Sequence, residues 1–213
     1  MKIDLSNFLQ WRINVFFYKR LSWKVAFFYI YTLGTLFFSL NRKEKEEIES
    51  AIHTVFDDRK DNSEIKAVLR NVFRGIFSHY YEKLFNAFSS AETLKTFLDM
   101  HIQKQGITAI RRALSNGKGV LLVTGHFGGV EFIPAFLAAN SCPVTIIAKF
   151  SSEHLRETSI QKAKNFSTRI IDADNTPNIM KAVFDNLRGN RIVITQCDEI
   201  GEWRPSRKNT LFF

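Results

Sequence analysis

Apolar residues recur with a helical period in the first half of the chain. In residues 65–84 they fall three or four positions apart for about five turns, and Asp61, Asn62 and Ser63 offer an N-cap just before them. Residues 44–56 place Ile48, Ala51, Ile52 and Val55 on one face. The pattern predicts two amphipathic helices. The aromatic stripe of the longer helix would pack in a core or line a groove for an acyl chain.

The pattern changes at about Leu98. Leu98, Met100 and Ile102 alternate with polar residues, which predicts an edge strand, and a helix is expected at Ile107–Leu114. Strands and helices then alternate. The predicted strands are Val120–Thr124, Val144–Ala148, Arg169–Asp172 and Ile192–Gln196, and the predicted helices are 131–139, 153–164 and 178–187. We expect an α/β fold, a mostly parallel or mixed sheet flanked by helices, with central strands covered on both faces.

An uncharged stretch, residues 25–40, lies in a basic N-terminal region. Before Glu44 there are seven Lys or Arg residues and one acid, Asp4. A spanning helix needs about 20 apolar residues, and this run is slightly short and rich in the Tyr and Phe that favour interfaces. It suits a short or tilted span, a helix in the membrane surface or a buried core helix. No small-residue cleavage pattern follows it, which disfavours a signal peptide.

These patterns suggest a division of the chain. Residues 1–43 form a basic hydrophobic membrane-associating segment, and residues 44–213 form the α/β domain, helical over 44–90 and sheet-containing over 97–213. Residues 209–213 resemble the start of a strand that then stops. We therefore expect the C-terminal part of the domain to be missing.

The basic composition predicts a partner that carries negative charge. The 213 residues carry a formal net charge of +9, which suits nucleic acid, anionic membrane lipids or an acidic carrier protein. No nucleic-acid-binding motif is present and the basic residues cluster with the apolar N-terminal run, so we expect no nucleic acid partner. The two cysteines, Cys142 and Cys197, form no CxxC and suit a reducing compartment.

The segment 124–131, Thr-Gly-His-Phe-Gly-Gly-Val-Glu, carries the candidate chemistry. His126 follows the end of a strand that its apolar run predicts to be buried, where sites gather in α/β sheets, and Glu131 starts the next helix. Glu131 could fix the imidazole tautomer and leave the other nitrogen to take a proton. The glycines at 125, 128 and 129 allow close backbone approach and amides aimed at an oxyanion. By itself the spacing fits a structural histidine as well.

Other catalytic patterns are not found in the sequence. It contains no GxSxG, GxxxxGK[ST] or HExxH motif. His79 and Glu82 lie three residues apart on the long helix without a second ligand pair, so we expect no metal site. Cys197 lacks an activating cation in the sequence around it, and we expect it to pack rather than react.

An ordered set of motifs covers most of the chain. Residues 124–131 match an HxxxxD/E motif, residues 116–128 form its approach, and Glu82 lies on the preceding helical region. Gln196-Cys197-Asp198-Glu199 follow as a strand end that contains an aspartate, and residues 210–213 begin a Phe-Phe segment. This set resembles the glycerolipid and lysophospholipid acyltransferase superfamily. The fuller pattern looks like the bacterial late acyltransferases of lipid A biosynthesis and their relatives that acylate mannosylated phosphoinositides.

The resemblance implies an O-acyltransferase without metal or prosthetic group. His126, oriented by Glu131, would deprotonate a lipid hydroxyl, which would attack an acyl thioester with no covalent acyl-enzyme. Gly125, Phe127, Gly128, Gly129, Lys149 and Asp198 would bind substrate or shape the site. Two departures stand out: Gly129-Val130 replaces an Asn-Trp pair, and Lys149 replaces an arginine. A lysine keeps the charge and loses the bidentate fork.

The leading hypothesis is an acyltransferase at the cytoplasmic face of the bacterial inner membrane. Its donor would be acyl carrier protein or acyl-coenzyme A, and its acceptor a glycolipid of the lipid A type. The alternatives are a truncated, non-catalytic lipid-binding protein of the same fold, and a thioesterase or lipid hydrolase that uses water as acceptor. The sequence does not distinguish the two donors, because both are acidic.

Overall fold

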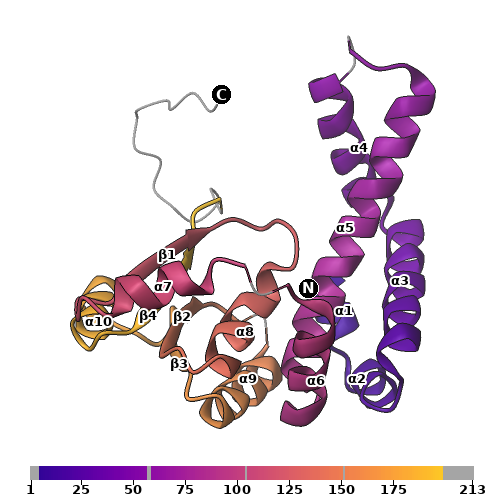
Figure 1. The fold of residues 1–213 in the computed structure, drawn as a ribbon. Helices are drawn as coiled ribbons and strands as arrows, with labels where there is room; N and C mark the ends of the chain where they lie inside the picture. Colours follow the sequence, from indigo (N-terminus) through magenta and orange to yellow (C-terminus); the bar gives the residue numbers. More distant parts are fainter. Residues whose placement is uncertain (1–4, 57–58, 104, 151, 199–213) are drawn as a thin grey trace. The chain divides into compact units, whose positions relative to one another are not determined.

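The computed structural model describes residues 5–56, 59–103, 105–150 and 152–198 (Figure 1). The chain divides into two compact units. The first comprises Met1–Thr96 and Phe150–Lys162, and the second comprises Phe97–Lys149 and Ala163–Phe213. Each unit is described by itself below. The strand start expected at 209–213 lies outside the described residues.

The first unit is helical. Its helices are α1 (Leu5–Leu9), α2 (Arg12–Tyr18), α3 (Trp23–Leu40), α4 (Arg42–Phe56) and α5 (Asn62–Phe88). The helix α6 (Ala91–His101) leads into the second unit, and α9 (Glu153–Asn165) begins in the first. The two amphipathic helices expected from the sequence are therefore present as α4 and α5.

The aromatic stripe of α5 packs against α3, its neighbour in Figure 1. The Phe77 ring lies 5.1 Å from that of Tyr31 and 6.0 Å from that of Phe38, and Phe38 lies 5.1 Å from Phe73. Phe77, Tyr81, Leu84, Phe85 and Phe88 are all buried. Core packing, the first of the two interpretations of this stripe, is confirmed.

The contact between α3 and α5 depends on a glycine. A Cβ built on Gly34 would lie closer to the Phe77 ring carbons than van der Waals contact allows, whereas one on Gly75 in α5 meets nothing within 4 Å. We expect Gly34→Ala to cost roughly 1–3 kcal/mol through overpacking. Gly75→Ala should be neutral or gain up to about 1 kcal/mol in helix propensity.

Both substitutions bring the same change in helix propensity, so their difference isolates the overpacking. Chemical denaturation of the two variants and the wild type in one detergent measures it. Equal stabilities of the two variants would show that Phe77 moves aside at no cost.

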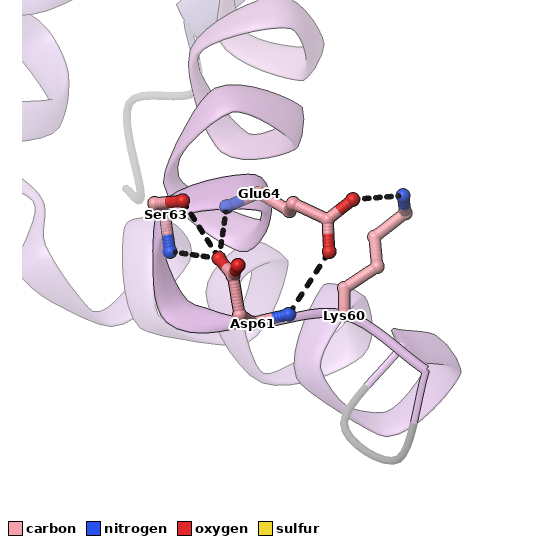
Figure 2. A network of polar contacts seen from close by, with 4 residues as sticks. All are labelled: Lys60, Asp61, Ser63 and Glu64. Atoms are coloured by element: carbon pink, nitrogen blue, oxygen red, sulfur yellow. Dashed lines mark hydrogen bonds and ion pairs between the residues drawn. The ribbon is translucent and has the colours of Figure 1, made fainter.

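The start of α5 is fixed by a capping box, shown in Figure 2. One Asp61 carboxylate oxygen accepts hydrogen bonds from the backbone N–H groups of Ser63 (2.7 Å) and Glu64 (2.9 Å) and from the Ser63 hydroxyl (2.7 Å). The Glu64 carboxylate accepts in return from the Asp61 N–H (3.0 Å) and meets the Lys60 ammonium at 3.5 Å. The predicted N-cap is confirmed.

The cap makes stability depend on pH. The Ser63 hydroxyl, followed by the two backbone amides, lowers the pKa of Asp61 in the folded chain. A lowered folded-state pKa means that the stabilisation is complete above the unfolded value of about 3.9 and is lost as pH falls through the folded value. Asp61→Ala should therefore lower the unfolding midpoint at neutral pH, and the deficit should shrink in acid.

Asp61→Asn is the matched control, because asparagine caps about as well as aspartate without titrating. At neutral pH its unfolding midpoint should stay near that of the wild type. As the pH falls, the wild-type midpoint should decrease relative to that of Asp61→Asn, because only the aspartate takes up a proton. A deficit of Asp61→Ala that is the same at every pH would contradict this account.

Residues 98–101 lie in α6, so the edge strand expected from Leu98, Met100 and Ile102 is wrong. Leu94 and Leu98 are both fully buried one turn apart, and the amide of Ile102 donates to the Leu98 carbonyl (3.1 Å). The Ser90 hydroxyl accepts from the Thr93 amide at 3.0 Å and caps the start of α6. Alternation over three apolar positions is too short to decide between strand and helix once Leu94 is included.

The described residues of the second unit contain a four-stranded parallel sheet. The strands β1 (Val120–Thr124), β2 (Val144–Ala148), β3 (Arg169–Asp172) and β4 (Ile192–Gln196) lie in the order β1-β4-β2-β3. Residues of α7 (Ile107–Leu114) and α8 (Ile133–Ala139) pack with one apolar cluster of the sheet, and α10 (Ile179–Arg188) packs with another. The predicted α/β fold and all four strand positions are confirmed.

The strands differ in burial. Val144, Thr145, Ile192 and Val193, in the two central strands, are fully buried, as continuous apolar runs predict. β1 lies at the edge of the described sheet, and its Leu121 and Val123 are about half exposed. The expectation that the strand before His126 is buried is wrong within the described residues. Its apolar run reflects an edge strand with one covered face.

Candidate active site

The register of the two strands β1 and β4 positions the candidate site. Val120 pairs with Ile192, and the pairing continues in step to Thr124 and Gln196. Beyond the strands, the Cys197 amide still donates to the Thr124 carbonyl at 3.0 Å. His126 and Asp198 each lie two residues past these paired ends. The parallel ladder therefore brings them side by side at the carboxyl end of the sheet.

His126 meets the Asp198 carboxylate twice. Its backbone N–H donates to Oδ2 at 2.5 Å, and its ring Nδ1 lies 2.8 Å from Oδ1. A carboxylate beside Nδ1 favours the tautomer with the proton on Nδ1, which makes Nε2 the basic nitrogen. The two contacts also fix the direction of the ring relative to the backbone.

The pair is accessible to water. The His126 side chain is 29% exposed and that of Asp198 44% exposed. The His126 backbone N–H, followed by its ring, lowers the pKa of Asp198. Because this pKa is lowered, the carboxylate stays charged, and the pair stays formed, to a lower pH than an isolated aspartate would allow.

Gly125 leaves the space that Asp198 occupies. A Cβ built on Gly125 would lie 2.9 Å from Asp198 Oδ2, whereas one on Gly129 would meet only Phe132 Cδ2, at an ordinary 3.6 Å. We expect Gly125→Ala to push the carboxylate away from His126, and Gly129→Ala to leave the pair in place.

The imidazole nitrogen resonances of His126 measure this effect. In Gly125→Ala they should lose the signature of a proton held on Nδ1, and in Gly129→Ala they should keep it. An unchanged signature in Gly125→Ala would mean that the pair tolerates the extra methyl group by moving as a unit.

The loop after His126 turns towards Glu131. Gly128 has a φ of +57°, a conformation that glycine adopts without strain, and the exposed ring of Phe127 projects into solvent. Glu131 is half-buried in the 3₁₀ turn Val130–Phe132. Buried side chains on both sides, Val130 and Phe132, anchor this turn. The expected helix over 131–139 is thus a 3₁₀ turn followed by α8.

Two further predicted residues are placed by the sheet. Lys149 is exposed and directly follows β2, which pairs in parallel with β4, so it belongs to the same sheet edge as Asp198. Cys197 is exposed, and the expectation that it packs is wrong.

The family resemblance suggested a site-shaping role for Asp198 and did not identify it as the partner of His126 Nδ1. The one signal in the sequence was that β1 and β4, which are of equal length, end two residues before His126 and Asp198.

Metal ligands do not gather in the described part of the chain. Within it, no group of three or more His, Cys, Asp or Glu residues has the arrangement of a metal site. The titratable side chains that the sheet brings to the carboxyl ends of β1, β2 and β4 include one imidazole, one carboxylate and one ammonium: His126, Asp198 and Lys149. These groups can take up a proton, orient a ring and bind an anion.

A comparison with models of known protein families shows the family of this chain. The model of the family described as bacterial lipid A biosynthesis acyltransferase matches residues 7–201. The chain belongs to this family. The lipid A acyltransferase match covers both units and includes the His126 loop and Asp198, so the resemblance found in the sequence is confirmed and the protein is an acyltransferase. A search of curated proteins finds no individual match.

One helix of this acyltransferase, among the residues described, has the length and apolar composition of a membrane span. It is α3, and 28% of its span window is buried. Buried core helices and signal sequences can share this composition.

Proposed function

We propose that this protein transfers a fatty acyl chain from a thioester donor to a hydroxyl of a lipid A-type glycolipid, with His126 as general base. The observation that carries the proposal is the double contact of His126 with Asp198, which leaves Nε2 as the basic nitrogen. Glu131, five residues on, is the second carboxylate proposed to orient the ring.

The proposed reaction needs no covalent acyl-enzyme. Nε2 of His126 takes the proton of the acceptor hydroxyl as its oxygen attacks the thioester carbonyl. The tetrahedral intermediate carries a negative oxygen, for which the backbone amides of Gly128 and Gly129 are the proposed donors. Collapse breaks the carbon–sulfur bond, and the thiolate takes the proton back from the imidazolium. The base is thereby regenerated.

The remaining predicted residues have roles in binding. Lys149, exposed at the same edge of the sheet, would hold an anionic group of the acceptor. Phe127, 74% exposed beside the base, would contact the acyl chain. The donor would be acyl carrier protein or acyl-coenzyme A, and no metal or prosthetic group is required.

We also propose that α3 lies against lipid at the cytoplasmic face of the inner membrane. Val25, Phe28, Tyr31, Leu36 and Leu40 are exposed on it. The serine and threonine hydroxyls on the same helix are already satisfied: Thr32, Thr35 and Ser39 donate to the carbonyls four residues earlier at 2.9, 2.8 and 2.8 Å. Such a face can enter hydrocarbon without an unpaired serine or threonine hydroxyl, and the phenol of Tyr31 suits the membrane interface.

The test supplies purified protein with a labelled acyl thioester and a lipid A-type acceptor lacking one acyl chain. Labelled acylated lipid supports the proposal, and Cys197→Ser should form it at the wild-type rate because no acyl-cysteine is involved. Free fatty acid without acylated lipid would identify a hydrolase. Mass spectrometry of lipids from a deletion strain would name the acceptor by the acyl group it lacks.

A further inference from the structure

A basic pocket lies in the first unit, away from the His126 loop in the sequence. Its volume is about 460 Å³, and it is lined by Arg12, Ile13, Val15, Phe16, Lys19, Arg20 and His154. Three of these side chains are permanent cations, and this described lining contains no carboxylate. The composition of the pocket therefore favours an anion.

The pocket is held together by contacts that join the residues on either side of α2 to the start of α9 and to Phe88 at the end of α5. The Ser152 hydroxyl donates to Oε1 of the buried Gln10 at 2.5 Å and accepts from the Leu155 amide at 3.2 Å. The His154 ring stacks on Phe88 with centroids 5.4 Å apart, and the Lys19 ammonium lies 5.1 Å from the centroid of the same ring. One phenylalanine thus supports two of the groups that line the pocket.

The guanidinium of Arg20 is also held in place. It lies 3.6 Å from the centroid of the Phe16 ring and donates one hydrogen bond to the Phe16 carbonyl at 3.1 Å. A guanidinium has five N–H donors in a plane, a geometry that matches a phosphate. Across the described residues, no carboxylate forms an ion pair with Arg12, Lys19 or Arg20.

The rim of the pocket indicates where the anion comes from. Ile13 is 61% exposed and Phe16 51% exposed, and Trp11 and Phe17 beside them are also exposed. A free phosphate would gain nothing from these apolar groups, whereas a phospholipid carries its phosphate next to acyl chains. We propose that the pocket binds the phosphate of an anionic phospholipid headgroup, with the apolar side chains of α2 at the boundary of the acyl layer.

This proposal deepens the membrane association proposed above and does not depend on the chemistry of His126. The first experiment measures binding of the full-length protein to vesicles of phosphatidylcholine with and without added phosphatidylglycerol. The triple variant Arg12→Gln, Lys19→Gln, Arg20→Gln should lose roughly 100-fold in partitioning to the anionic vesicles, because each cation near the surface contributes to binding.

The matched control removes three cations from the exposed positions of α5, as Lys66→Gln, Arg70→Gln, Arg74→Gln. Its net charge equals that of the first variant, so a general attraction to the membrane would weaken both alike. We expect the α5 variant to lose less than about tenfold. Equal losses would overturn the proposal of a specific pocket.

The second experiment separates a lipid headgroup from free phosphate. Dihexanoyl phosphatidylglycerol below its micelle concentration, and inorganic phosphate, are titrated while the His154 ring resonance is followed, with His154→Gln to assign it. The lipid should shift the resonance and phosphate at the same concentration should not. Equal shifts would point to a site for phosphate alone, and no shift with the lipid would also overturn the proposal.

The two proposals fail in different ways. Absence of acyl transfer by the wild type would remove the proposed function and leave vesicle partitioning and the His154 titration unaffected. Conversely, a protein that transfers acyl chains but binds vesicles equally well with and without the three pocket cations would remove only the headgroup site.

Discussion

His126→Ala should reduce acyl transfer from the thioester donor by roughly 10²- to 10⁴-fold or more. The proposed mechanism gives this one imidazole both proton transfers, from the acceptor hydroxyl and to the leaving thiolate. The side chain is partly exposed and rests on Asp198, so its removal leaves the apolar clusters of the sheet intact. The measurement is the rate of labelled lipid formation under saturating donor.

The control for this experiment is His53→Ala, which removes a histidine from an exposed position of α4. It should transfer acyl chains at the wild-type rate. Circular dichroism and the unfolding midpoint should match the wild type for both variants. A well-folded His126→Ala protein with unchanged transfer would exclude His126 as the base.

Much of the second unit could be predicted because its signals are local. The strands are short apolar runs set off by turn residues, such as Gly117 and Gly119 before β1. α6 was missed because three alternating positions mimic a strand when Leu94, one turn earlier, is left out. The N-cap of α5 was found because Asp61, Asn62 and Ser63 lie directly before the apolar rhythm of the helix, whereas the returning bond from Glu64 was seen only in the structure.

The site was less predictable because it depends on strand order. His126 and Glu131 are close in sequence, so their association could be proposed from the spacing alone. The contact with Asp198 spans 72 residues and requires β1 to pair with β4 rather than with β2. No local pattern encodes which strand is the neighbour of β1, and the same uncertainty made a half-exposed edge strand resemble a buried one.

The pairing makes Asp198→Asn the sharpest test of the site. The new amide would place an N–H₂ group where Nδ1 now finds a carboxylate, which favours the tautomer that puts the proton on Nε2 and removes the base. In Ser-His-Asp enzymes the corresponding change lowers kcat by about 10⁴-fold. Here water reaches the pair, so we expect a loss of roughly 10²- to 10³-fold in kcat.

Several readouts separate this orienting role from a merely structural one. The KM of the donor should change little, since Asp198 is proposed to act through His126 and not on the thioester. The nitrogen resonances of His126 should show a proton on Nδ1 in the wild type and a shift of that proton in Asp198→Asn. Asp198→Glu, which restores a carboxylate, should recover part of the rate.

Glu131→Gln provides the comparison, because the sequence motif makes Glu131 the orienting carboxylate. If both carboxylates act through the imidazole, each variant should lose rate, and the double variant should lose less than the product of the two single losses. Unchanged tautomer resonances and kcat in Asp198→Asn, together with a large loss in Glu131→Gln, would return the orienting role to Glu131 alone. The contact with Asp198 would then serve only to join the ends of β1 and β4.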